Sequence, residues 1–268
     1  MKRFVPIAKG CLVLLLVASL TLAARSKWER KTAVQSYEEA REVARTLPSR
    51  DTHKTLGGMS ASAPEEEQPL DPMEQLAQID LAALQEINPD VIGWIEIPDT
   101  ELSYPIVQGK DNQYYLNRTW DRKHSSAGSI FMDCNSSAAL DQFHAIIYGH
   151  RMNDSSMFGT LRNYRDPDFW PEHPSVYVAT AEKVYRYDLF SAQEAGITGV
   201  VYRLDIEESG LEEEFLQYCT DNAVVNTALE LTAEDRYLTL STCTGYGHAT
   251  RWVVHGVLGR TYERPPAE

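Results

Sequence analysis

The pattern of apolar and polar positions divides this chain into three parts. Residues 4–24 are apolar except for Lys9, residues 48–72 offer almost nothing to bury, and short apolar runs recur from Met73 onward. A long apolar segment is typical of a membrane helix, and a stretch rich in Pro, Gly, Ser and Glu is typical of a linker. The pattern therefore predicts one globular domain joined by a linker to an N-terminal anchor.

The apolar N-terminal segment fits a retained transmembrane helix. Its uncharged part, residues 10–24, has only fifteen residues, but Lys9 can extend its amine to the lipid headgroups and lengthen the usable span to twenty-one residues. A basic and aromatic cluster, Arg25–Lys31, follows in place of a small-residue cleavage site. We therefore predict that residues 1–31 are a single-pass anchor in the cell membrane, and cleavage behind the apolar segment remains the alternative.

Residues 32–72 are expected to form a juxtamembrane helix followed by the polar linker. Apolar residues recur there at helical spacing, with charged residues on the opposite face, at Val34, Tyr37, Ala40, Val43 and Leu47. Residues 48–72 then lack the apolar side chains that a packed element needs, so we expect a flexible spacer.

Residues 73–262 have the pattern of a mainly β (α+β) domain, with residues 263–268 as a short tail. Helices are expected over residues 73–87, at Ser156–Tyr164 and at Gly210–Asn222. Eight runs rich in β-branched or aromatic residues are predicted as strands, and eight short strands favour one β-barrel or sandwich over a βαβ array. These runs are Gly93–Ile97, Ser103–Gln108, Ser129–Asp133, Phe143–Gly149, Val176–Thr180, Val184–Ala192, Tyr237–Thr242 and Trp252–Gly259.

The distribution of charge narrows the classes of function. The net charge is −14, with +6 in residues 1–50 and −20 in residues 51–268. So acidic a body is repelled by phosphate backbones, which argues against a nucleic-acid partner. A short basic segment ahead of an acidic body instead suits attachment to a membrane at the N-terminus.

One of the four cysteines stands out as a reactive residue. Cys11 lies in the predicted anchor, so Cys134, Cys219 and Cys243 form an odd set outside it, with at least one free thiol. Their spacing does not match a structural metal site, and buried thiols are the simplest expectation for the first two. Cys243 differs because it ends the strand-like run Arg236–Cys243 and is followed by the turn sequence Thr-Gly-Tyr-Gly. A strand end holds a reactive group on a rigid support.

An arginine and a histidine complete the candidate catalytic site. If the next strand pairs with that of Cys243, Arg251 returns close to the thiol, where its guanidinium would favour a thiolate and stabilise an oxyanion. The residues by themselves leave two candidates for the general acid and base. His150 ends the predicted fourth strand, and His248 lies in the loop after Cys243. The strand-interior histidines are expected to be structural.

These segments resemble the sortase family. Tyr148–Met152 (YGHRM) resembles the segment with the family's catalytic histidine, and Thr239–Cys243 (TLSTC) resembles its TLxTC cysteine motif. Arg251 resembles the family's downstream arginine. Class B sortases in particular resemble Ile87–Leu116 (INPDVIGWIEIPDTELSYPIVQGKDNQYYL), Gly128–Asp133 (GSIFMD) and Met157–Tyr164 (MFGTLRNY).

The resemblance implies an eight-stranded sortase-type β-barrel with an N-terminal helix and a helix between strands six and seven. It also implies a membrane-anchored cysteine transpeptidase with its catalytic domain outside a Gram-positive cell. The thiol would attack a Thr carbonyl in the C-terminal sorting signal of a secreted protein and form a thioacyl enzyme. An amine of peptidoglycan or of its lipid-linked precursor would then take the acyl group.

The resemblance assigns roles residue by residue, with no metal or cofactor. Cys243 would be the nucleophile, His150 the general acid and base, and Arg251 the oxyanion or substrate-positioning residue, for which Arg260 and Arg236 are rivals. Substrate-groove positions would be Ser241, Asn112, Leu116 and Thr244.

Two other functions remain open from the sequence. A pilin-polymerising sortase would use the same catalytic residues with a lysine acceptor. A non-catalytic binding domain on a stalk would leave Cys243 inert.

Overall fold

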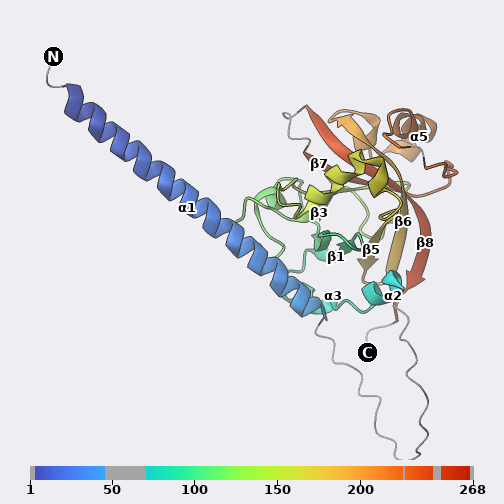
Figure 1. The fold of residues 1–268 in the computed structure, drawn as a ribbon. Helices are drawn as coiled ribbons and strands as arrows, with labels where there is room; N and C mark the ends of the chain where they lie inside the picture. The colour runs from blue at the N-terminus through green and yellow to red at the C-terminus, as the bar shows by residue number, and fades with distance from the viewer. Residues whose placement is uncertain (1–3, 46–70, 226, 244–248, 266–268) are drawn as a thin grey trace, which may run out of the picture.

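The computed structural model describes the backbone of residues 4–45, 71–225, 227–243 and 249–265, with side chains except those of residues 4–16, 22, 23, 26 and 243. A long N-terminal helix packs along one side of a β-barrel, and shorter helices lie around the barrel (Figure 1). The predicted linker residues 48–70, Thr244, His248 and residues 266–268 of the tail lie outside the described residues.

Eight strands close into a barrel in the order β1-β2-β3-β4-β7-β8-β6-β5, so the predicted eight-stranded barrel is confirmed. Pairs β2–β3 and β4–β7 are parallel, and the other six are antiparallel. Strands β6 and β8 are each 14 residues long and exceed their predicted lengths. The strands are β1 Val91–Glu96, β2 Ser103–Val107, β3 Ile130–Met132, β4 His144–Tyr148, β5 Ser175–Thr180, β6 Lys183–Gly196, β7 Tyr237–Cys243 and β8 Thr250–Glu263.

The barrel wall separates two apolar cores. Side chains alternate between the two faces of a strand, so Leu238 and Leu240 of β7 join the main core whereas Tyr237 joins a second one. Helix α5 (Glu212–Asp221) covers the second core with Phe215 and Cys219, both fully buried. This is the helix predicted between the sixth and seventh strands, and its three acidic residues in the first turn suit the helix dipole.

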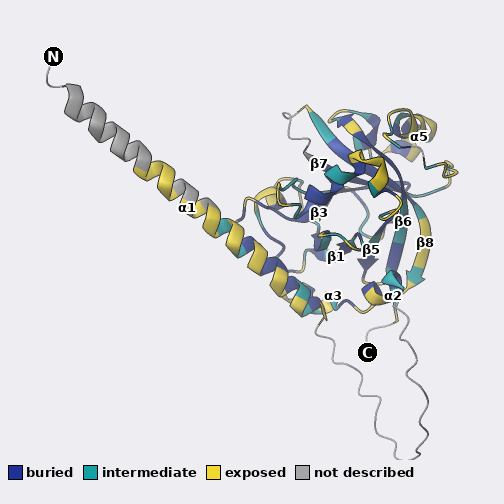
Figure 2. Cartoon of the chain, viewed as in Figure 1, coloured by how far each residue is buried: buried dark blue, intermediate teal, exposed yellow. Residues whose placement is uncertain are grey.

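Helix α1 (Phe4–Arg45) is continuous through the predicted anchor and juxtamembrane helix. Its C-terminal part packs on the barrel and its N-terminal part projects away (Figure 1). The packed face is Ala33, Tyr37, Ala40 and Ala44, each at most 4% exposed, and its alanines allow close approach (Figure 2). Val34, expected on this face, is 56% exposed because the small residues determine which side meets the barrel.

The predicted membrane span receives no support from helix α1 as described. No helix in the described part of the chain is long and apolar enough to cross a membrane. The side chains of residues 4–16, which make up most of the predicted span, lie outside the described residues.

Two predicted helices differ in detail. The helix expected over residues 73–87 is split into α2 (Pro72–Ala77) and α3 (Leu81–Ile87), because the Asp80 carboxylate accepts from Ala83 N–H and begins a new helix. The segment expected to be helical at Ser156–Tyr164 is the 3₁₀ helix η2 (Phe158–Arg165). In this segment the Leu161 carbonyl accepts a hydrogen bond from the indole of Trp252 on β8, at 2.8 Å. The remaining short helices are η1 Tyr114–Asn117, η3 Pro167–Phe169, η4 Val200–Tyr202 and α4 Ile206–Ser209.

Candidate active site

Three neighbouring strands bring the predicted catalytic residues to one end of the barrel. Cys243, the last residue of β7, pairs directly with Arg251 of β8. Opposed residues of an antiparallel pair have Cα atoms about 4.5–5.5 Å apart. On the other side of β7, the parallel register sets Tyr148 of β4 beside Ser241, and Gly149 N–H donates to the Ser241 carbonyl at 3.2 Å.

Extending that parallel register by two residues sets His150 level with Cys243. In this register the backbone of Cys243 lies between that of His150 on one side and that of Arg251 on the other. The strand pairing expected from the sequence is therefore present. The side chain of Cys243 lies outside the described residues, so the juxtaposition rests on the backbone.

The ring of His150 is held by a backbone carbonyl. Its Nε2 donates to the Leu116 carbonyl at 2.6 Å, and since a carbonyl only accepts, Nε2 carries the hydrogen. In the neutral ring Nδ1 is then the nitrogen that accepts a proton. Gly128 lies against the same ring: a Cβ there would be 2.9 Å from His150 Cδ2, and its φ is +60°. Only glycine fits this position without strain.

Arg251 is fixed between two strands, with β7 on one side and Ala195 of β6 on the other. Its guanidinium Nη1 donates to the Thr250 carbonyl at 3.0 Å. The two rival arginines have partners elsewhere. Arg260 pairs with Asp71 at 2.9 Å, and Arg236 donates to the Leu140 carbonyl at 3.0 Å. Arg260 follows Arg251 by nine residues along β8, which is about 30 Å at the usual strand rise.

The predicted groove residues have different surroundings. Leu116 presents a side chain that is 41% exposed, while its carbonyl holds His150. Asn112 donates to Asp133 Oδ2 at 2.7 Å and accepts from Cys134 N–H at 2.8 Å. Ser241 is only 2% exposed.

Three residues near this face were not singled out from the sequence: Asp133, Tyr148 and Tyr202. The Tyr202 hydroxyl lies 2.8 Å from Ser241 Oγ. The Tyr148 hydroxyl donates to Asp133 Oδ2 at 2.9 Å, and burial together with that carboxylate raises the pKa of Tyr148. Tyr148 could have been found by alternation, two residues before His150. No pattern in the sequence points to Tyr202, which comes from the distant 3₁₀ helix η4.

The other two thiols of the barrel domain, both free, are poor nucleophiles. Cys219 is fully buried, and burial raises its pKa well above the usual value. The pKa of Cys134 is also raised, first by burial and then by Asp133. A raised pKa leaves little thiolate at neutral pH, and the thiolate is the reactive form. Burial therefore disfavours the reactive thiolate form of both residues.

Two strand histidines form a buried hydrogen-bonded chain behind the candidate site. His144 Nδ1 lies 3.0 Å from the Arg203 carbonyl and must donate to it, so His144 Nε2 accepts from the Thr239 hydroxyl at 2.6 Å. That leaves His255 Nδ1 to donate to Thr239 Oγ1 at 2.9 Å. His255 Nε2 accepts from the Gln193 amide at 3.3 Å. Both neutral rings are satisfied in this one arrangement.

Burial disfavours the charged form of both rings. It lowers the pKa of His144 to about 4 and, with a smaller effect of the neighbouring His144, the pKa of His255 to about 3. These histidines are structural at neutral pH, as expected for strand interiors.

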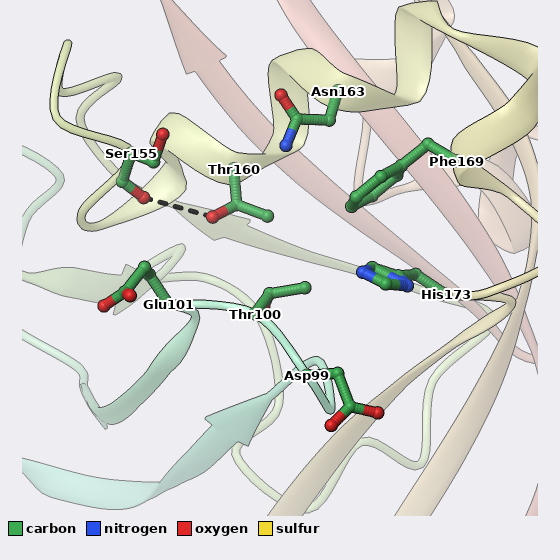
Figure 3. Close-up of a pocket in the computed structure, with 8 residues that line it drawn as sticks. All are labelled: Asp99, Thr100, Glu101, Ser155, Thr160, Asn163, Phe169 and His173. Atoms are coloured by element: carbon green, nitrogen blue, oxygen red, sulfur yellow. Dashed lines mark hydrogen bonds between the residues drawn. The ribbon is translucent and has the colours of Figure 1, made fainter.

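A cavity of about 450 Å³ lies apart from these residues, between the β1–β2 turn and the segments η2 and η3 (Figure 3). Its Thr160 hydroxyl donates to the Ser155 carbonyl at 3.1 Å, and His173 packs on Phe169 with ring centroids 4.0 Å apart. Within the described part of the chain its lining holds no paired nucleophile and base. The lining is Asp99, Thr100, Glu101, Ser155, Thr160, Asn163, Phe169 and His173.

Comparison with known proteins gives consistent matches. The sequence profile of the sortase domain matches residues 95–259. Sortase B of Listeria monocytogenes is 38% identical over 165 residues, or 61% of this chain and 67% of that protein. The Staphylococcus aureus sortase B–substrate complex has a TM-score of 0.63 at 33% identity, covering 69% of this chain and 86% of that one. Sortase B from B. anthracis in complex with AAEK1 has a TM-score of 0.68 at 30% identity, covering 87% and 99%.

Proposed function

This chain belongs to the sortase family of cysteine transpeptidases, in its class B, and from that membership we propose that Cys243 is the nucleophile, His150 the general acid and base, and Arg251 the oxyanion-stabilising residue. The observation that carries the proposal is the register across β4, β7 and β8, which supports one level along the barrel for the backbone of all three residues. The raised pKa values of Cys134 and Cys219 support the choice of thiol.

In the first half-reaction the Cys243 thiolate attacks the carbonyl carbon of a Thr in a sorting signal. The carbonyl electrons move to oxygen, and the Arg251 guanidinium, which cannot deprotonate, balances that charge. The protonated His150 gives its proton to the departing amine as the C–N bond breaks. The products are a thioacyl enzyme and the released C-terminal peptide.

In the second half-reaction an amine attacks the thioester carbonyl. His150 is now neutral and takes the proton that the amine loses, and the amide forms as the thiolate leaves. The thioester keeps the acyl group reactive between the two steps. The hydrogen bond from His150 Nε2 to the Leu116 carbonyl supports a fixed ring orientation in both steps.

The proposed substrates are secreted proteins that carry a C-terminal sorting signal. Leu116, with its exposed side chain above the carbonyl that holds His150, would line the groove. Asn112, Ser241 and Thr244 remain proposed groove positions. The proposed acceptor is an amine of peptidoglycan or of its lipid-linked precursor.

The proposed location is the outer face of a Gram-positive cell membrane, with α1 as the anchor. Val17 and Leu20 are 51% and 61% exposed on α1, and Trp28 is 68% exposed beside basic residues, a composition that suits a membrane interface. Detergent-phase partitioning of the full chain tests this: the full chain should enter the detergent phase, and a variant lacking residues 1–31 should stay in the aqueous phase. Equal partitioning of the two would contradict the anchor.

Transpeptidation is tested with the full chain in detergent micelles and a panel of labelled NPxTx- and PxTG-like peptides. The expected result is cleavage after Thr and transfer to an added amine, both lost in Cys243→Ala. Mass spectrometry of the new bond identifies the acceptor: a peptidoglycan-type amine supports wall anchoring, and a pilin lysine would instead support pilus polymerisation. Cleavage and transfer that persist in Cys243→Ala would sink the proposal.

A further inference from the structure

Helix α1 reaches the loop that holds His150 through one buried hydroxyl. Tyr37 is 4% exposed, and its hydroxyl donates to the Gly128 carbonyl at 2.6 Å, across 91 residues of sequence. A buried carbonyl that loses its donor carries the full cost of desolvation, so this contact constrains where Gly128 lies. Helix α1 thereby contacts the loop beside His150, and the sequence of the helix does not predict this contact.

Gly128 in turn lies against both members of the histidine's hydrogen bond. A Cβ on it would be 2.6 Å from the Leu116 carbonyl oxygen and 2.9 Å from His150 Cδ2. The backbone of Gly128 therefore lies close to the ring and to the carbonyl that the ring donates to, and a displacement of Gly128 toward them would disturb this hydrogen bond.

Hydrogen bonds close the segment from Tyr115 to Ser129 on itself. Ser129 N–H donates to the Tyr115 carbonyl at 3.0 Å, and the Ser129 hydroxyl donates to the Arg118 carbonyl at 2.7 Å. Helix α1 holds this unit a second time, since the Trp120 indole donates to the Ser36 carbonyl at 2.9 Å. The Leu116 carbonyl thus belongs to a strap fastened to α1 at neighbouring residues.

The backbone of His150 is tied to the same helix from the other side. The rings of Tyr37 and Tyr104 meet edge to face with centroids 5.2 Å apart. The Tyr104 hydroxyl accepts from Met157 N–H at 3.1 Å, and the next residue, Phe158, donates its N–H to the His150 carbonyl at 3.0 Å. Tyr37 therefore contacts Gly128, which lies against the ring of His150. It also contacts Tyr104, which is linked through Met157 and Phe158 to the main-chain carbonyl of His150.

We propose that Tyr37 is a positioning residue for His150, so that helix α1 is part of the frame of the active site and not only a tether. This rests on the proposed role of His150 as general acid and base. Loss of the hydroxyl frees the Gly128 carbonyl and loosens the strap, so the Leu116 carbonyl no longer fixes the ring. Proton transfer depends on such alignment, whereas binding of the peptide in the groove depends on it much less.

The chain offers a matched control for removing this hydroxyl. Tyr185 is also 4% exposed, and its hydroxyl also donates to a backbone carbonyl, that of Ala139, at 2.9 Å. Tyr185 pairs with Thr261 on β8, far along the strand from Arg251. Tyr185→Phe therefore removes the same kind of hydrogen bond, from a less deeply buried hydroxyl and far from Arg251.

The experiment compares Tyr37→Phe with Tyr185→Phe in the full chain in micelles, at a temperature where both remain folded by circular dichroism. For Tyr37→Phe the expected result is a fall in kcat of about tenfold with the peptide KM within about twofold. Tyr185→Phe should match the parent in both constants. Equal kcat in the two variants would overturn the proposal, and so would a loss confined to KM.

A second readout does not depend on turnover. In a Cys243→Ala background, the ¹⁵N shifts of labelled histidines report which ring nitrogen of His150 carries the hydrogen. The expected spectrum is a dominant Nε2–H form that becomes a mixture in Tyr37→Phe and is unchanged in Tyr185→Phe. An unchanged spectrum in Tyr37→Phe would contradict the positioning role. If Cys243→Ala retained transfer, the proposed function would fail instead, and the spectra would still test the positioning.

Discussion

Arg251 lies directly opposite Cys243 across the antiparallel pair β7–β8. Seven consecutive residues of β7, from Tyr237 to Cys243, fix this register. A slip of one residue would turn every side chain to the other face and bury polar groups in the main core, so the register is strongly specified. The whole length of the ladder therefore holds the backbone of Arg251 opposite that of Cys243.

Replacing Arg251 should slow the chemical step. Arg251→Ala removes the charge that we propose to balance the oxyanion, and we expect kcat/KM to fall about 10²–10³-fold. Arg251→Lys keeps the charge without the planar fork and should fall between the parent and Arg251→Ala. Arg260→Ala, on the same strand but paired with Asp71, is the control and should stay within about twofold of the parent. Equal losses in Arg260→Ala and Arg251→Ala would rule out a specific role.

Replacing His150 separates it from its rival histidine. His150→Gln keeps a side-chain donor for the Leu116 carbonyl but cannot transfer a proton, so kcat should fall about 10²–10⁴-fold. His248→Ala should leave kcat near the parent value. Steady-state rates with one labelled peptide suffice for both variants. The reverse ranking would transfer the acid–base role to His248.

Gly128 and Gly210 make a matched pair for testing contact with the histidine. Their φ values are +60° and +62°, so alanine strains the backbone equally, by about 1–2 kcal/mol. A Cβ at Gly128 meets the Leu116 carbonyl and His150, whereas a Cβ at Gly210 meets nothing within 4 Å. Both variants should melt at a lower temperature, but only Gly128→Ala should lose most of its transfer rate. Full activity in Gly128→Ala would show that the ring tolerates the displacement.

The buried histidine pair makes stability depend on pH. In the unfolded chain both rings titrate near 6.5, and burial lowers the folded pKa of His144 to about 4 and of His255 to about 3. The unfolded state binds more protons between these values. Stability is therefore intact above pH 6.5 and falls as the pH falls below it, by about 2–3 kcal/mol between pH 7.5 and 5.5.

Urea unfolding at a series of pH values measures this effect. His144→Gln keeps hydrogen-bonding groups but cannot titrate in this range, so it should lose about half of the dependence. A free energy of unfolding that stays constant from pH 7.5 to 5.5, or a dependence unchanged in His144→Gln, would contradict the neutral chain through Thr239.

The barrel and its reactive end could be predicted from local patterns. Each strand carries its own apolar periodicity, and the three candidate residues Cys243, His150 and Arg251 stand at or near strand ends. The structure pairs the first with the third and ends β4 two residues before His150. The resemblance to the sortase family supplied the catalytic role expected of each of these three residues. Helix breaks were harder to predict, because Asp80 caps a new helix only when its side chain turns toward Ala83 N–H.

Long-range docking could not be predicted from the sequence. Val34 looked like part of the packed face of α1, but the alanines around it decide how closely the helix approaches. The bond from Tyr37 to Gly128 joins residues 91 apart, and the bond from Tyr202 to Ser241 joins a 3₁₀ helix to a strand far along the chain. Neither hydrogen bond corresponds to a periodic pattern in the sequence.

Formation of a thioacyl bond on Cys243 is the most direct test of the proposed mechanism. The full chain is mixed with an acceptable sorting peptide in the absence of an acceptor amine, and its intact mass is measured by mass spectrometry. We predict a mass increase equal to the acyl part of the peptide up to Thr, located on Cys243 by fragmentation, removed by hydroxylamine and absent in Cys243→Ala. Cleavage of the peptide by Cys243→Ala, or an adduct on another residue, would contradict the mechanism.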